Sequence, residues 1–276
     1  MATLNQYDKT NSKSPPGHGH IVCHLSSSTT RPSFSTFRAS YPIKLLTPKV
    51  HSPYLAAAYI ITYGGGMVSG DSVFLSVEIH PNVNLMLLTQ GSTKIYKQRP
   101  GKMFVNNNIL QNGEGLKISE GTRQKLNSFI HKNALLLQLP DPTTCFRDAD
   151  FTQRQVFTLQ DVTSSVIILD WFTCGRMSRG ERWDFFKYDS VLYGPKVIPL
   201  INFIIEEFNK IVIGKIDKMP ELVWSASILN EKQSIINGVV VKVAGITTEL
   251  VRNFLVKFAL KDLKDIIGEN LFERAL

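Results

Sequence analysis

The sequence has few cysteines, no long apolar run and no signal-peptide pattern in its first residues, and each of these features argues against a class of protein. Its three cysteines, Cys23, Cys145 and Cys174, are odd in number and widely spaced, so they form neither a disulfide framework nor a CxxC site. No stretch approaches the roughly 18 apolar residues that a membrane-spanning helix requires. The first residues lack the basic-then-apolar order of a secretory signal. We therefore expect a soluble, cytoplasmic protein with no membrane contact.

Composition favours one folded chain without a strongly basic surface stripe. Hydrophobic residues make up 43% of the 276 residues and charged residues 20%, which excludes a wholly disordered chain. The net charge is +8, from 31 Lys and Arg against 23 Asp and Glu, and the pI is near 9.3. The basic residues are scattered, as on a solvated or protein-docking surface. We expect no nucleic-acid partner, and keep a basic β-rich nucleic-acid-binding protein as an alternative.

The order of local signals predicts a flexible extension followed by one mainly β domain. Residues 1–39 are rich in Ser, Thr, Pro and His and show no apolar period, which is typical of a flexible extension. Residues 40–276 are expected to form a single domain. Apolar and polar side chains alternate over Val73–His80, as in a half-buried strand. Further strand signals recur about every ten residues up to residue 190, separated by turn residues, which indicates a many-stranded architecture.

The C-terminal part adds a few helices. Pro199–Phe208 is apolar enough for a short buried helix or another strand, and periodicity does not separate the two. Thr247–Ile267 carries apolar residues at steps of three and four, which predicts an amphipathic helix. Thr247 or Thr248 can cap its start, and Gly268 can end it.

Two glycine-containing turns resemble catalytic motifs only superficially. Tyr63–Ser72 has the glycine spacing of a phosphate-binding loop, but Asp71 stands where that loop needs a lysine, and a strand follows instead of a helix. A tight turn between strands is the better interpretation. Gly175–Glu181 misses the spacing of a nucleophile elbow by one residue. A small-molecule enzyme with turns 64–71 and 175–181 as its pocket stays an alternative, although the sequence offers no convincing acid, base or nucleophile set.

One compact group of potential metal ligands lies in the N-terminal extension. It consists of His18, His20, Cys23 and His24. Imidazole binds nickel, copper and zinc alike. Because the segment is expected to be flexible, the metal ion itself would have to assemble the site. The remaining histidines, His51, His80 and His131, are isolated and lack the HExxH spacing.

Five segments in a fixed order carry a family resemblance. They are Tyr41–Leu46, Tyr63–Asp71, Thr89–Tyr96, Leu139–Pro142 and Gly175–Glu181. In this order they resemble the urease accessory proteins called UreD (UreH in some bacteria). The resemblance is strongest over residues 40–190 and weaker beyond them, and Gly268–Leu276 is shorter than the ending we expect of the family.

The resemblance implies a protein that is not an enzyme. Members of the family bind apo-urease and a UreF-type partner, which recruits a UreG-type GTPase, and together these proteins deliver Ni²⁺ into the urease active site. The fold implied is a β-helix-like stack of strands with a few helices and an internal polar route for the metal. No tightly bound cofactor is implied, only Ni²⁺ in transit.

Four residues of the family-like segments are candidates for such a route. They are Asp71, Ser92, Asp141 and Glu181. Carboxylates and hydroxyls let a hydrated cation pass, whereas clustered Cys and His would hold it firmly. The alternative is that Asp71 and Glu181 anchor turns through hydrogen bonds or arginine pairing.

Overall fold

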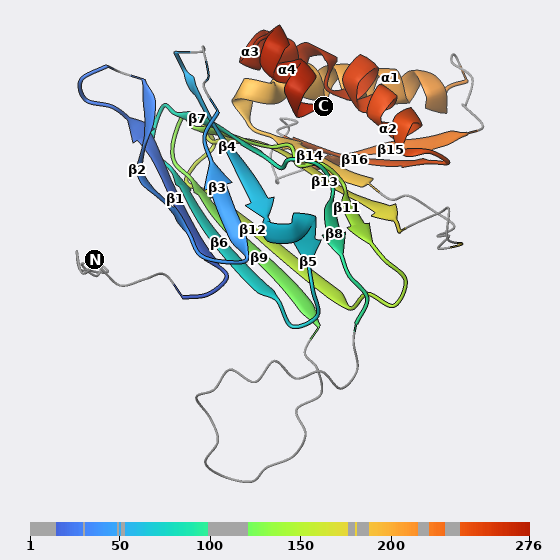
Figure 1. Ribbon diagram of the computed structural model, residues 1–276. Helices are drawn as coiled ribbons and strands as arrows, with labels where there is room; N and C mark the ends of the chain where they lie inside the picture. The colour runs from blue at the N-terminus through green and yellow to red at the C-terminus, as the bar shows by residue number, and fades with distance from the viewer. Residues whose placement is uncertain are drawn as a thin grey trace.

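The computed structural model describes residues 15–29, 31–48, 50, 53–98, 121–175, 180, 188–214, 221–229 and 238–276. These residues form three layers: sheet A, sheet B and a set of helices that covers the far face of sheet B (Figure 1). Among the described helices, none combines the length and apolar composition that crossing a bilayer would demand.

Most described residues of the N-terminal two thirds belong to strands. Five-stranded sheet A has the order β12 (Phe151–Leu159), β9 (Thr122–Ile130), β6 (Ser72–Ile79), β1 (His18–Leu25) and β2 (Pro32–Ala39). Sheet B runs through β15 (Leu222–Leu229), β16 (Gly238–Gly245), β14 (Tyr188–Tyr193), β13 (Ser165–Cys174), β10 (Leu135–Gln138), β7 (Asn84–Leu88), β4 (Leu55–Thr62) and β3 (Ile43–Leu46). A short row C joins sheet B through β13 and contains β5 (Gly66–Met67), β8 (Thr93–Ile95) and β11 (Thr143–Cys145).

The chain winds through the three rows as a parallel coil. It passes from sheet B to row C to sheet A three times, as β4–β5–β6, β7–β8–β9 and β10–β11–β12, and then returns to sheet B in β13. Strands of successive turns pair in parallel in every row. The expected mainly β fold, a β-helix-like stack of strands with a few helices, is therefore confirmed.

Residues 18–25 and 32–39 are strands, so the prediction of a flexible extension over residues 1–39 is wrong for them. β1 lies inside sheet A, parallel to β6 and antiparallel to β2. Ile21 and Cys23 are fully buried in the core between the two sheets. The sequence of β1 looks polar because histidines occupy its outer face. Its apolar inner face is made by alternate residues and is therefore hard to recognise from composition.

The central strands β7 and β10 of sheet B are buried on both faces, and successive residues of these strands enter different cores. Leu136 faces sheet A and packs with Ile21 and Val77, whereas Leu135 and Leu137 face the helices. Strands buried on both sides are expected to be almost continuously apolar, as the run from Ala134 to Leu139 is apart from one glutamine.

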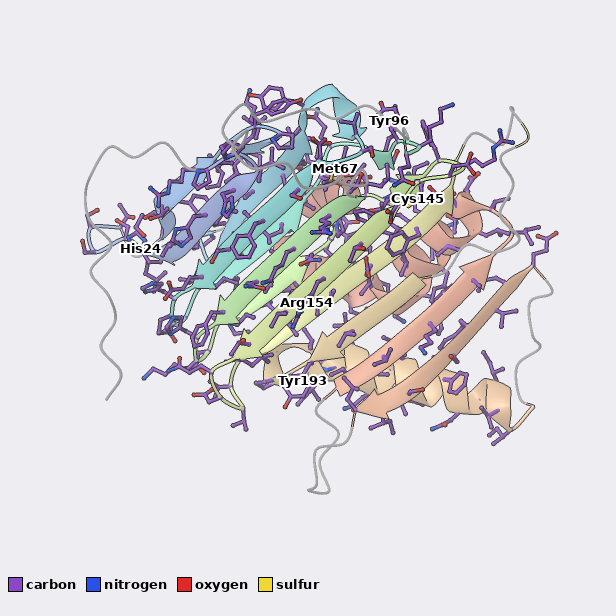
Figure 2. The ribbon with its side chains drawn as sticks, turned by 90° about the horizontal axis from the view of Figure 1, so that it is seen from below. His24, Met67, Tyr96, Cys145, Arg154 and Tyr193 are labelled. Atoms are coloured by element: carbon purple, nitrogen blue, oxygen red, sulfur yellow. The ribbon has the colours of Figure 1, made fainter. Side chains whose placement is uncertain are left out.

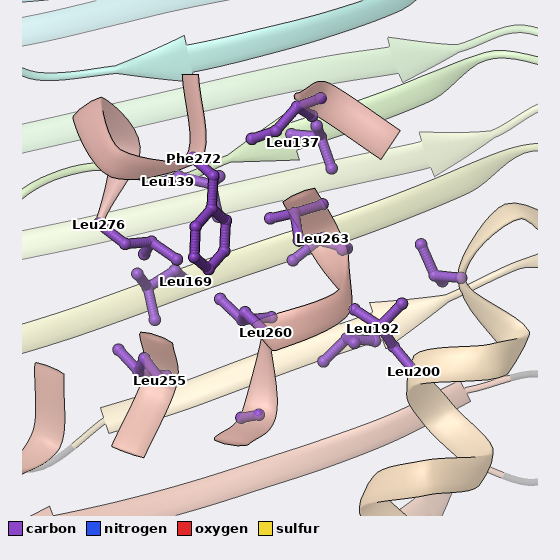
Figure 3. Packing of buried hydrophobic residues seen from close by; sticks show 14 of the residues in the cluster. Leu137, Leu139, Leu169, Leu192, Leu200, Leu255, Leu260, Leu263, Phe272 and Leu276 are labelled. Atoms are coloured by element: carbon purple, nitrogen blue, oxygen red, sulfur yellow. The ribbon is translucent and has the colours of Figure 1, made fainter. Parts of the chain in front are cut away.

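The helical layer contains α1 (Ile198–Val212), α2 (Thr248–Phe254), α3 (Lys264–Ile267) and α4 (Glu269–Ala275). Pro199–Phe208, for which the sequence did not distinguish a helix from a strand, lies within the helix α1. The helix predicted over Thr247–Ile267 begins and ends as expected: Thr247 Oγ1 accepts a hydrogen bond from the Leu250 amide at 3.2 Å, and Gly268 has φ 84°. Between its ends, a π-helical turn over Leu255–Ala259 and a 3-10 turn over Lys261–Leu263 interrupt it. Figure 3 shows leucines of this layer meeting Leu137 and Leu169 of sheet B.

We expect Leu137→Ala to lower the free energy of unfolding by about 2–5 kcal/mol, because it leaves a cavity in the fully buried core under the helices. Urea unfolding followed by circular dichroism measures this change. Val162→Ala is the control, since Val162 is 72% exposed and its truncation should cost less than about 0.5 kcal/mol. Equal costs for the two variants would contradict the three-layer packing.

Candidate functional site

A polar cavity lies between sheets A and B, inside the coil. Its volume is about 70 Å³, which is room for a few water molecules. An open pocket lined by Cys145 and Phe172 lies beside it, and three polar residues border both spaces. The amide and carboxylate residues that line the cavity are Gln124, Gln138, Asp141, Gln153, Gln155 and Asp170.

Strand alternation points these side chains inward. Gln153 and Gln155 lie on the inner face of β12, at the edge of sheet A. Gln138 ends the apolar run of β10 in sheet B, and Asp170 follows the inward residue Ile168 on β13. The Gln138 Nε2 atom donates a hydrogen bond to Gln155 Oε1, so one side-chain bond connects the two sheets across the cavity.

Two amide oxygens of the cavity have no hydrogen-bond partner among the described residues. They are Gln138 Oε1 and Gln153 Oε1, and both are buried. A buried polar atom without a partner costs about 1–3 kcal/mol, so each oxygen favours a water molecule or a cation beside it. Lys125 also borders the cavity, but its Nζ lies 5.2 Å from the centroid of the Phe74 ring, on the outer face of sheet A. The cavity thus offers oxygen atoms to a water molecule or a cation.

Asp141 connects two successive corners of the coil. Its Oδ2 accepts hydrogen bonds from the Gly91 amide at 2.8 Å and from Thr89 Oγ1 at 3.2 Å, and its own amide donates to Thr89 Oγ1 at 2.7 Å. Thr89 and Gly91 belong to the corner between β7 and β8, which also contains Ser92. The structure therefore brings Asp141 and the Ser92 corner together, with Asp141 on the cavity wall.

Asp71 lies at a different corner, between β5 and β6. Its Oδ2 accepts a hydrogen bond from the Val68 amide at 2.9 Å and closes the glycine-rich turn. The glycines at 65 and 70 have φ of 72° and 89°, which confirms that this segment is a strand-to-strand turn that requires glycine. Neither Asp71 nor Ser92 is among the described residues that line the cavity. Glu181 lies outside the described residues, and the metal route through these four residues stays a prediction.

The N-terminal ligand group is divided between two faces of β1. Cys23 is fully buried in the core, and burial raises the pKa of its thiol to about 12. His18, His20 and His24 occupy alternate positions on the outer face. Burial, with a contribution from Arg38, lowers the pKa of His20, which favours its neutral form. The structure therefore does not bring Cys23 together with the histidines.

Sequence reasoning missed the inward glutamines and Asp170. A signal was present, since Gln138 is the one polar residue in the run Leu135–Leu139, and Gln153 and Gln155 share the inner face of their strand. It also treated His80 and His131 as isolated, whereas their ring centroids are 5.1 Å apart. Only the parallel register of β6 and β9 places these two histidines side by side.

Comparison with known proteins identifies relatives for this chain. Residues 17–192 match the family model of the UreD urease accessory protein. The chain is 42% identical over 180 residues to urease accessory protein 4 of Cryptococcus neoformans, covering 62% of this chain and 54% of that protein. It is 38% identical over 156 residues to urease accessory protein D of Arabidopsis thaliana, covering 55% and 47%. It is 28% identical over 269 residues to urease accessory protein UreD of Sorangium cellulosum, covering 86% and 77%. The chain thus spans about half the length of the fungal and plant relatives.

We expect Cys23 and Cys145 to resist alkylation in the folded protein. Burial raises the pKa of Cys145 to about 11 and that of Cys23 to about 12, and only the thiolate reacts. At pH 8 about 10⁻⁴ of the Cys23 thiol is ionised, so iodoacetamide should label both residues at least about 100-fold more slowly than in urea-unfolded protein. Peptide mass spectrometry measures each rate. Fast labelling of native Cys23 would contradict the docking of β1 and restore a flexible N-terminal segment.

Proposed function

This chain belongs to the UreD family of urease accessory proteins, and we propose that it is a non-enzymatic scaffold for urease assembly. In this proposal it binds apo-urease and a UreF-type partner, and it reaches a UreG-type GTPase through that partner. The complex supports delivery of Ni²⁺ into the urease active site, in the cytoplasm. Nickel is cargo here and not a resident cofactor.

The cavity inside the coil is the observation that supports a role in moving the metal. A route for Ni²⁺ has to solvate a divalent cation without trapping it. The buried oxygens of Gln138 and Gln153, together with the Asp141 and Asp170 side chains, supply oxygen ligands, which bind Ni²⁺ more weakly than imidazole or thiolate. Cys145 borders the outer pocket, but its pKa of about 11 keeps it a thiol, which is a poor ligand at neutral pH.

The proposal also gives Asp141 a structural part in the route. Its carboxylate holds the corner of one coil turn against the corner of the previous turn, and the same side chain borders the cavity. Any metal that passes there would meet a carboxylate already held by an amide and a hydroxyl donor, which weakens its attraction for a cation.

The direct test is urease activation in cells that contain apo-urease and the other accessory proteins, in medium with nickel, with and without this chain. We expect active urease only when the chain is present, because assembly requires the scaffold. Equal activity without the chain, together with failure of the chain to co-purify with urease or a UreF-type protein, would contradict the proposal. An empty vector and an unrelated β protein are the controls.

A paired substitution on β12 and β13 tests the cavity itself. Gln153→Leu replaces an inward amide of sheet A whose oxygen has no partner among the described residues, and combining it with Asp170→Asn removes a carboxylate charge on the sheet B side of the cavity. We expect the double variant to bind urease normally and to lower the yield of nickel-loaded urease severalfold, measured as activity and bound nickel per urease. Arg154→Leu is the matched control, because Arg154 is the neighbouring residue on the exposed face of β12 (Figure 2).

Unchanged nickel loading in the double variant would remove the cavity from the proposal and leave the scaffold role. Loss of urease binding would show instead that the substitutions disturb the docking surface or the fold.

A further inference from the structure

The outer face of sheet A gathers histidines. Five of the six histidines of the chain lie on it: His18, His20 and His24 on β1, His80 just after β6, and His131 just after β9. The residues of β6 that share this face are Phe74, Ser76 and Glu78, since Val73, Leu75 and Val77 face the core. Figure 2 looks onto this face and shows His24 near one side of the sheet.

Three of these side chains converge on one point. Glu78 and His80 lie two residues apart on the same face of the chain, and the parallel register of β6 and β9 places His131 beside His80. His131 Nε2 is 3.0 Å from Glu78 Oε1, and His80 Nε2 is 3.5 Å from the same oxygen. One ligand atom from each residue lies within 4.8 Å of the other two. All three side chains are partly exposed, so solvent can reach the point between them.

The hydrogen bonds around His131 determine which of its nitrogens carries a proton. The Lys132 amide donates to Gln160 Oε1 at 3.0 Å, and because an amide N–H can only donate, the atom facing it is the oxygen of Gln160. The same oxygen lies 3.1 Å from His131 Nδ1, so Nδ1 must carry the hydrogen. In the neutral ring Nε2 then has a lone pair, and it faces the Glu78 carboxylate at 3.0 Å. Two acceptors at this distance need a cation between them, which is either a proton or a metal ion.

The ligand types and their spacing fit a metal ion. Ligand atoms about 2.1 Å from a metal are separated by about 3.0 Å at an octahedral angle and about 3.4 Å at a tetrahedral one. The separation of 3.0 Å between His131 Nε2 and Glu78 Oε1 lies in this range, and that of 3.5 Å from His80 Nε2 is just above it. Rotation of the 42% exposed His80 side chain can bring its nitrogen towards that of His131. The bond from Nδ1 of His131 to an oxygen is the outer-shell contact that orients metal-ligating histidines.

We propose that Glu78, His80 and His131 form a surface site for a divalent first-row transition cation such as Ni²⁺ or Zn²⁺. Two imidazoles and a carboxylate favour these ions over Mg²⁺ and Ca²⁺, which prefer oxygen ligands alone. Three protein ligands leave positions for water, so the bound ion exchanges readily. The site itself is independent of the proposed function, whereas Ni²⁺ as its occupant in the cell rests on that function.

A fourth histidine lies next to this site. The ring of His24 is 6.3 Å from that of His80, measured between centroids, and His24 Nδ1 is buried with no hydrogen-bond partner in the part of the chain that the structure describes. This imidazole nitrogen lies beside the three ligands and can serve as a fourth ligand to the metal. The site therefore lies at the margin of β1, β6 and β9, on the opposite face of sheet A from the cavity.

Equilibrium dialysis of the purified full chain against Ni²⁺, and separately Zn²⁺, tests the site without urease. We expect saturable binding that excess Mg²⁺ does not displace. Glu78→Gln and His80→Ala should each weaken the binding at least tenfold, since removal of even an outer-shell partner costs about 10–100-fold in affinity. His18→Ala is the matched control, because it removes an exposed histidine from the same face outside the cluster. Circular dichroism and thermal unfolding verify that each variant is folded.

Three results would overturn the proposal. The first is wild-type protein that binds neither metal, which would leave a proton between His131 and Glu78. The second is equal affinity in wild type and folded Glu78→Gln, which would place binding elsewhere. The third is an equal loss in His18→Ala, which would show that the ligand set is different. Because dialysis contains no urease, failure here is distinct from failure of urease activation.

Discussion

The central strands β7 and β10 of sheet B are covered on both faces, by helices on one side and by sheet A on the other, and the rest of the structure depends on this constraint. Side chains of a strand alternate between faces, so every position of β7 and β10 has to be apolar or hydrogen-bonded. Leu135, Leu136 and Leu137 satisfy the rule by packing. Gln138, at the end of β10, satisfies part of it through Gln155 of sheet A. The polar cavity begins where the two-sided apolar core ends.

Asp71 and Asp141 lie at corners of the coil, where their carboxylates accept hydrogen bonds from the backbone. A parallel coil has to keep each turn in register with the next, and backbone pairing alone does this only within the strands. Asp141 accepts from the amide of Gly91 in the preceding turn, whereas Asp71 accepts from Val68 within its own turn. Both carboxylates therefore stabilise corners, and only Asp141 also borders the cavity. Substituting Asp141 removes a bond that keeps two turns in register, whereas substituting Asp71 opens a single corner.

Local patterns in the sequence predict the local parts of this fold and fail for the long-range ones. The strand over Val73–His80 and the caps at Thr247 and Gly268 depend on neighbouring residues, and they are found as expected. β1 was missed because the histidines on its outer face conceal the apolar inner face. The adjacency of His80 and His131 was also missed, since parallel strands of a coil are separated by a whole turn of chain. Spacing alone carries no information on that pairing.

Strand alternation also sorts metal ligands by strength. On β1 it turns Cys23 into the core, where burial keeps the thiol protonated, and leaves the histidines outside. On β12 it turns Gln153 inward and Arg154 outward. Nitrogen ligands therefore gather on the outer face of sheet A, and oxygen ligands line the cavity. A cation moving through such a protein would be held more firmly at the surface than inside, because imidazole binds transition metals more tightly than amide or carboxylate oxygen does. Together the two proposals predict that the cation is captured at the outer face and released inside.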